Sequence, residues 1–200
     1  MDEPRTLHAR NPRTGENDYT FEAMSEAAVH DQARALRTAQ SAWQAAGLEA
    51  RIAALRALQK EIEQRQDSIA TALSIDTGRG TLARGEVGGV LRSMERWCTI
   101  APELMRGVIA PSSLPNVSIE QTIEPYPLLG VISPWNFPLL LSFIDATPAL
   151  LAGCAVLIKP SEVTPRFAAA VAQAVEAVPK LRDVLAFCPG DGATGAALVP

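Results

Sequence analysis

The chain has 200 residues, of which 48% are hydrophobic and 20% are charged, and its formal net charge is −4. These values are typical of one globular domain, or of one domain and part of a second, and they exclude a disordered or fibrous chain. The charge balance, 18 basic against 22 acidic residues, provides no basic surface for nucleic acid.

The N-terminal residues, MDEPRTLHAR, lack the basic start and apolar segment of a signal peptide. The longest apolar run is interrupted by Asp145 and Pro148, so it does not reach the roughly 20 residues that span a bilayer. We therefore expect a soluble, cytoplasmic protein without a membrane partner.

Three helices are predicted in the first half of the chain. Residues 11–15, NPRTG, have the composition of a turn between short extended segments. Apolar residues at helical spacing then predict a helix capped by Ser25 and ended near Gly47, a second helix that ends at Gly78, and a third over about 82–104. No chemistry concentrates on these helices, and we interpret their apolar faces as core.

The composition changes after the third helix. Residues 107–116 are rich in proline and serine and are interpreted as a connection. The alternation of Val117, Ile119, Gln121 and Ile123 with polar neighbours then predicts one or two half-exposed strands.

From residue 128 onward, apolar strands alternate with helices. The predicted strands cover residues 128–133, 156–159 and 184–188, and the predicted helices cover residues 139–151 and 165–178. Strands that are apolar throughout and alternate with helices are typical of a doubly wound parallel α/β sheet. Pro148 should kink or end the first of these helices.

Polar residues follow each of these strands. Asn136 comes after the first strand, Lys159 and Glu162 lie at the end of the second, and Asp191 follows the third. In open α/β sheets, ligands bind beyond the carboxyl ends of the strands, which meet at one edge. The sequence therefore predicts a site at this edge.

Each of these residues also has an interpretation without a site. Asn136 can be a turn residue that bonds nearby backbone, Lys159 a strand-end lysine that reaches water, and Glu162 a charge favoured by a helix N-terminus. In the functional interpretation, Glu162 accepts hydrogen bonds from the hydroxyls of an adenosine ribose and Lys159 adds a donor to the same ribose. The Asn136 amide would then donate to a developing negative oxygen.

A glycine-rich segment follows the third strand. Residues 190–195, GDGATG, match the pattern G-x-G-x-x-G, but in dinucleotide-binding folds that pattern follows the first strand. The first turn here holds the bulky residues Pro134, Trp135 and Asn136 instead. The standard Rossmann mode of pyrophosphate binding is therefore not expected.

The three cysteines, Cys98, Cys154 and Cys188, are widely spaced, and His8 and His30 are the only histidines. None of these residues is at metal-ligand spacing, so the sequence predicts no metal site. We interpret each cysteine as a small buried hydrophobe.

Three motifs resemble the aldehyde dehydrogenase superfamily: LGVISPWNFPL at residues 129–139, PALLAGC at 148–154 and KPSEVTP at 159–165. They occur in the family's order and at its distances, and the resemblance extends over the whole chain as the N-terminal portion of such a protein. It implies an α/β fold with N-terminal helices, an incomplete doubly wound, Rossmann-like sheet, and a short antiparallel hairpin for oligomerisation.

The resemblance also implies a division of the chain. Residues 1–115 would be the N-terminal helical part of the cofactor-binding domain and residues 116–126 the oligomerisation hairpin. Residues 127–200 would be a truncated βαβ cofactor-binding unit.

The site residues are carried over position by position. Asn136 matches the asparagine whose amide helps to form the oxyanion hole, and it is the one catalytic residue implied here. The implied cofactor-binding residues are Ile132, Ser133, Pro134, Trp135, Asn136, Lys159, Ser161, Glu162 and Gly192. Because a glutamate on the ribose would repel a 2′-phosphate, NAD is the expected cofactor, with NADP as the alternative. The implied partners are a small-molecule aldehyde and, in the full-length protein, further copies of the same chain.

In that family, a cysteine thiolate attacks the aldehyde and a glutamate activates water, so that the acid forms through a thiohemiacetal and a thioester. The resemblance puts both residues beyond position 200, and we expect residues 1–200 alone to be marginally stable and inactive. Two interpretations stay open. The chain is the N-terminal part of an NAD(P)-dependent aldehyde dehydrogenase, or it is a short product that binds nucleotide or pairs with other subunits without turnover. The sequence does not indicate which aldehyde is oxidised.

Overall fold

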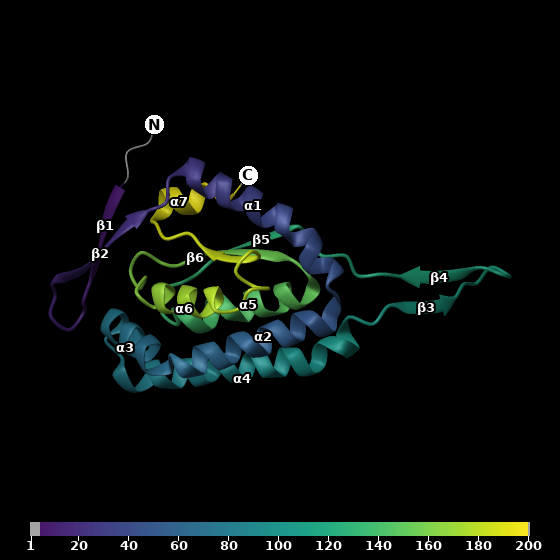
Figure 1. The fold of residues 1–200 in the computed structure, drawn as a ribbon, viewed down its shortest axis with the longest axis horizontal. Helices are drawn as coiled ribbons and strands as arrows, with labels where there is room; N and C mark the ends of the chain where they lie inside the picture. Colours follow the sequence, from purple (N-terminus) through teal and green to yellow (C-terminus); the bar gives the residue numbers. More distant parts are fainter. Residues whose placement is uncertain (1–4, 200) are drawn as a thin grey trace.

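A parallel sheet of three strands, in the order β5-β6-β7, lies at the centre of the computed structural model, which describes residues 5–199 (Figure 1). The elements in chain order are β1 (Arg5–Arg10), β2 (Asn17–Ala23), α1 (Glu26–Ala45), α2 (Gly47–Gln64), α3 (Gln66–Thr77), α4 (Gly80–Leu104), β3 (Val108–Pro111), β4 (Ser118–Gln121), β5 (Leu128–Ile132), α5 (Pro138–Ala152), β6 (Ala155–Lys159), α6 (Phe167–Glu176), β7 (Leu185–Phe187) and α7 (Gly192–Ala196). The predicted α/β class with a parallel sheet and a short antiparallel hairpin is confirmed.

Helices cover both faces of the sheet. In Figure 1, α1 and α7 lie above the sheet and α5 and α6 below it, with α2, α3 and α4 forming a further layer beneath α5 and α6. Every residue of β6 is buried, because this strand is in the middle of the sheet and is covered on both sides. The continuous apolar run in the sequence of this strand thus reflects its central position.

The N-terminal region has four helices where three were predicted. Ser25 caps α1 as expected, because its hydroxyl accepts the N–H of Ala28, and Gly78 ends α3 with a φ of 71°. The predicted second helix, however, is broken at Arg65, where φ is −102° and ψ is 10°. Apolar residues on both sides of the break pack into the same core, so the periodicity in the sequence continues through it.

The hairpin lies earlier in the chain than predicted. β3 pairs antiparallel with β4, with Val108 opposite Gln121, so the first strand falls within the segment that was interpreted as a connection. The predicted span of 116–126 therefore contains only the second strand. Pro111 ends this strand and the serines follow it, and a strand of only four residues is too short for a recognisable alternation.

Helix α5 continues through Pro148 to Ala152, so this proline does not end the helix near its own position. Tertiary contacts hold the last turn. Trp43 Nε1 donates to the carbonyl of residue 150 at 3.0 Å, Arg51 Nε to that of residue 151 at 2.9 Å, and Gln40 Nε2 to that of residue 153 at 2.8 Å. These side chains thus bind carbonyls at and just beyond the C-terminus of the helix, where fewer backbone partners are available.

A cluster of charged residues ties the N-terminal hairpin to the βαβ unit. The backbone N–H of Arg166 donates to Asp76 Oδ2 at 2.9 Å, and Arg166 Nε lies 2.8 Å from Asp76 Oδ1. The same guanidinium pairs with Asp18 and lies 4.9 Å from the ring centroid of Tyr19. Burial raises the pKa of Asp76 to about 6, although Arg166 acts in the opposite direction.

No helix within residues 5–199 combines the length and the apolar character that crossing a membrane requires.

The raised pKa of Asp76 predicts a pH-dependent contribution to stability. The folded state binds this proton more tightly than the unfolded chain, whose pKa is 3.8, so the contribution of Asp76 falls as pH rises from about 4 to about 6. A pKa difference of about 2 corresponds to about 3 kcal/mol. Urea unfolding should therefore show the stability difference between the protein and Asp76→Asn falling by about that amount over this range. A difference that is independent of pH would contradict the assignment.

Candidate functional site

The carboxyl ends of β5 and β6 lie side by side. Ile132 is the register partner of Lys159, and the Ser133 N–H donates to the Lys159 carbonyl at 2.9 Å. The turn after β5 is thereby placed next to the loop after β6. The structure thus brings the polar residues of the first two strand ends to one edge of the sheet.

A hollow of about 530 Å³ opens at this edge. Its lining residues are Ile132, Ser133, Pro134, Trp135, Lys159, Ser161, Glu162, Gly192, Gly195, Ala196 and Val199. All of the predicted cofactor-binding residues except Asn136 are among them. Gly195, Ala196 and Val199 were not predicted, and the glycine pattern at residues 190–195 was the only signal that pointed to their segment.

Lys159 and Glu162 form a donor and acceptor pair on the wall of the hollow. Lys159 Nζ lies 3.2 Å from Glu162 Oε2 and also donates to the Pro160 carbonyl at 3.0 Å. The lysine side chain is 4% exposed and that of the glutamate 45%. The interpretation of Lys159 as a lysine extending into water is therefore wrong. Because α6 begins at Phe167, Glu162 does not lie in the first turn of a helix either.

Asn136 lies in the turn between β5 and α5, and it is half-buried. Its side-chain amide has no hydrogen-bond partner among residues 5–199, which does not support its interpretation as a turn residue that bonds nearby backbone. The turn itself is held by other groups. Ser133 Oγ donates to the Pro138 carbonyl at 2.9 Å, and Ser142 Oγ donates to the same carbonyl at 2.6 Å. The Asn136 amide is thus a free donor on a well-anchored backbone.

The third strand end brings α7 to the hollow. The Asp191 carboxylate accepts the N–H groups of Ala193 and Thr194, at 3.0 and 3.4 Å, and it pairs with Arg5 at 2.7 Å. These contacts lower the pKa of Asp191, with the Arg5 hydrogen bond as the largest cause. Because a carboxylate already occupies these N–H groups, this turn is not arranged to bind a phosphate in the Rossmann manner.

All three cysteines are free and buried, as the sequence indicated. Burial raises the pKa of Cys98 to about 11 and that of Cys188 to about 12, and it also raises the pKa of Cys154. A thiol must ionise and be accessible to act as a nucleophile. Within residues 5–199 there is also no cluster of three or more His, Cys, Asp or Glu side chains that could hold a metal ion.

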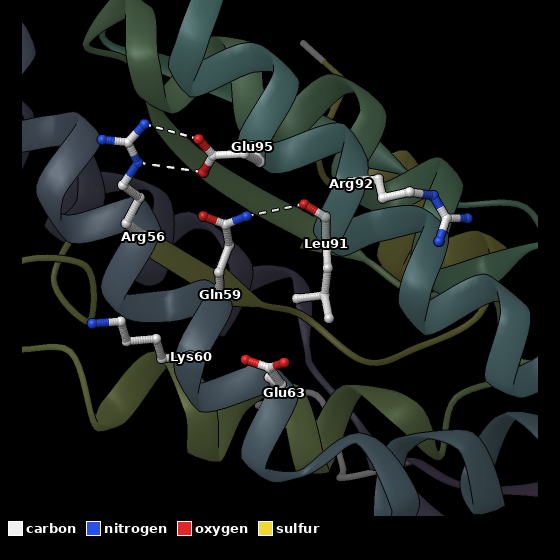
Figure 2. A pocket seen from close by; sticks show the side chains of 7 residues that line it. All are labelled: Arg56, Gln59, Lys60, Glu63, Leu91, Arg92 and Glu95. Carbon is white, nitrogen blue, oxygen red and sulfur yellow. Dashed lines mark hydrogen bonds and ion pairs between the residues drawn. The ribbon is translucent and has the colours of Figure 1, made fainter.

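A second hollow, of about 420 Å³, lies between α2 and α4 (Figure 2). Three of its polar side chains are paired within the hollow. Arg56 forms two hydrogen bonds with Glu95, at 2.9 and 3.3 Å, and Gln59 Nε2 donates to the Leu91 carbonyl at 2.9 Å. None of the residues predicted for the site lies there.

Two residues that contact the Asn136 turn or the start of α5, Arg79 and Glu86, were not predicted from the sequence. Arg79 immediately precedes α4 and lies 57 positions before its partner Asn136. Glu86 lies in α4, 53 positions before its partner Leu139. A charged residue on an amphipathic helix has no local signal that distinguishes a solvated side chain from one that reaches another element.

The chain is similar to known proteins in both sequence and structure. The sequence model of the family described as "Aldehyde dehydrogenase family" matches residues 1–200. The solved structure described as "Putative Aldehyde Dehydrogenase PutA" from Anabaena variabilis has a TM-score of 0.94 and 47% identity, over 97% of this chain and 42% of that one. A NAD-dependent benzaldehyde dehydrogenase from Corynebacterium glutamicum has a TM-score of 0.89 and 27% identity, over 99% of this chain and 44% of that one.

Among curated proteins, the 3,6-anhydro-alpha-L-galactose dehydrogenase of Streptomyces coelicolor is 32% identical over 196 residues, which is 97% of this chain and 39% of that protein. The chain spans between 25% and 39% of the length of the curated relatives it matches.

The burial of the three thiols predicts slow modification. At pH 8, Cys98 and Cys188 should remain almost entirely protonated, because their pKa values are about 11 and about 12. A thiol-disulfide reagent should therefore react with the folded chain far more slowly than with the chain in denaturant, where all three cysteines should be titrated. Rapid modification of any one of them in the folded chain would contradict this.

Proposed function

This chain belongs to the aldehyde dehydrogenase family, and on that premise we propose that it supplies the NAD-binding and oxyanion-stabilising part of an enzyme that oxidises an aldehyde to a carboxylic acid. The observation that carries the proposal is the hollow at the ends of β5 and β6, which collects eight of the nine proposed cofactor-binding residues.

The residues on the wall of the hollow fit an adenosine ribose. Lys159 offers an ammonium donor and Glu162 a carboxylate acceptor, 3.2 Å apart, so that neighbouring hydroxyls of one ribose could meet both groups. The hollow is open beside Gly192, because a Cβ atom there would meet no other atom within 4 Å. The carboxylate would repel a 2′-phosphate, which supports NAD over NADP.

The Asn136 amide is the proposed oxyanion donor. When bound, NAD would supply the acceptor for the hydride of the aldehyde. The proposed role of this chain at the reacting carbonyl is to present the side-chain N–H of Asn136 to the oxygen that becomes negative, from a turn whose backbone is already held in place. A free donor on a turn held by Ser133 and Ser142 supports that role.

The nucleophilic thiol is not proposed among the cysteines of this chain, because all three are buried. The same observation favours a second candidate, in which residues 1–200 bind nucleotide without turnover. The intact mass of the polypeptide from its source separates the two. A mass well above 21.3 kDa leaves room for a nucleophile, and a mass of 21.3 kDa favours the second candidate.

The β3–β4 hairpin is the proposed contact with a second copy of the chain. It extends away from the rest of the molecule (Figure 1), and its apolar residues Val108, Ile109 and Ile119 are 53%, 74% and 57% exposed. Such a strand pair has free edges and apolar faces, which are features of pairing surfaces.

The role of Glu162 predicts a change in cofactor preference. Glu162→Ala should weaken NAD binding about tenfold to hundredfold, as expected for a lost hydrogen bond to a charged group, and should reduce the preference for NAD over NADP. Titration calorimetry of the protein as its source produces it measures both affinities. Glu176→Ala removes the same charge at the end of α6, outside the hollow, and is the matched control. An unchanged preference in Glu162→Ala would reject the ribose assignment.

The role of Asn136 predicts a loss in kcat. Asn136→Ala should lower kcat by about 10²–10³, which is typical of removing one oxyanion donor. Steady-state kinetics of the active protein with a saturating aldehyde measure this. An effect confined to KM would show that Asn136 has a different role.

The hairpin assignment predicts a smaller assembly when charge is introduced. Ile109→Asp and Ile119→Asp should each lower the molar mass of the assembly in analytical ultracentrifugation, because a carboxylate in an apolar contact loses its hydration. The matched control is Leu82→Asp, which alters an exposed leucine on α4 away from the hairpin. If the three variants sediment alike, the hairpin does not form the contact.

A further inference from the structure

The N-terminus of α5 is capped by a side chain from another helix. Phe137 occupies the N-cap position and makes no side-chain hydrogen bond to the helix. Instead, Glu86 Oε1 accepts the N–H of Leu139 at 2.9 Å and the N–H of Leu140 at 3.0 Å. Glu86 lies on α4 and is only 6% exposed. A group outside the local sequence thus satisfies two of the N–H groups that begin α5.

Arg79 holds the turn on the other side of this cap. Its guanidinium donates to the backbone carbonyl of Asn136 and lies 4.8 Å from the ring centroid of Phe137. The residue with the free amide and its neighbour are therefore both in contact with the segment that leads into α4.

The positive charge of Arg79 and the N–H groups at the start of α5 favour the ionised form of Glu86. Burial raises the pKa of Glu86, while the N–H groups of Leu140 and Leu139 and the positive charge of Arg79 act against that rise. A carboxylate at a helix N-terminus also interacts favourably with the helix dipole. The buried Glu86 carboxylate therefore holds the start of α5 in place in addition to packing against it.

We infer that Glu86 and Arg79 are positioning residues that orient the Asn136 amide, Glu86 by fixing the start of α5 and Arg79 by fixing the Asn136 carbonyl. This inference rests on the proposed oxyanion role of Asn136. In this proposal Glu86 and Arg79 act only through the turn that they contact.

The consequence for rate follows from the geometry that an oxyanion hole requires. A donor is effective only when it lies within hydrogen-bonding distance of the position that the negative oxygen occupies in the transition state. Misplacement of a catalytic group by about 1 Å can lower a rate about 10²-fold. Loss of Glu86 should therefore lower kcat and should weaken NAD binding less than Glu162→Ala does, because Lys159 and Glu162 lie at the end of β6 and in the loop after it.

A double-mutant cycle tests this on the active protein as its source produces it. Glu86→Ala should lower kcat at least about tenfold, and the double variant Glu86→Ala with Asn136→Ala should be no slower than Asn136→Ala alone, because coupled residues are not additive. Glu86→Gln keeps an oxygen acceptor in the same place and should retain most of kcat. Amide hydrogen exchange at Leu139 and Leu140 should be faster in Glu86→Ala than in Glu86→Gln.

The matched control is Glu95→Ala, which removes a carboxylate from the same helix, where it pairs with Arg56 (Figure 2). This variant should leave both kcat and the exchange of Leu139 and Leu140 unchanged. If Glu86→Ala does not fold, Arg79→Ala carries the test, because Arg79 is only half-buried. It should lower kcat and should also be non-additive with Asn136→Ala.

The possible results separate the two proposals. If Asn136→Ala lowers kcat but Glu86→Ala and Arg79→Ala do not, or if their losses add to that of Asn136→Ala, the positioning role is wrong and the oxyanion role stands. If Asn136→Ala leaves kcat unchanged, the oxyanion role is wrong, and the positioning role is overturned with it.

Discussion

The candidate site depends on the placement of α5, and this helix is held at both ends by side chains from the N-terminal helices. Glu86 binds the first N–H groups of α5, next to the turn that carries Asn136. At the other end, Trp43, Arg51 and Gln40 take up the last carbonyls. Since a helix is stiff, fixing both ends fixes the turn that precedes it. The helical layer is thus the support of the site as well as part of the core.

The second constraint is the register of the parallel strands. With Ile132 opposite Lys159, the chain leaves β5 and β6 at the same height, and the two loops form one hollow. Shifting one strand by a single residue would exchange the faces on which its side chains lie. The burial of Lys159 beside the half-exposed Glu162 follows from this register. This pair presents a donor and an acceptor together, which suits the recognition of a diol.

The accuracy of the sequence-based analysis differed between local and distant features. The cap at Ser25, the stop at Gly78 and the buried strand β6 were all predicted, because each depends on a few neighbouring residues. The break at Arg65 was missed because the apolar periodicity continues across it. The helix over residues 139–151 was predicted, but Pro148 does not end it, since contacts from α1 and α2 bind its C-terminus although proline disfavours a helix interior by about 3 kcal/mol.

The sequence by itself determined the class of fold, the family resemblance and the short stretches at the strand ends where a site could form. Those features depend on neighbouring residues, through their composition, their spacing and their turn preferences. Only the tertiary structure decided that eight of the proposed residues share one hollow and that Glu86 and Arg79 hold the Asn136 turn. Contacts between residues more than 50 positions apart depend on how helices pack, and packing is a property of the whole chain.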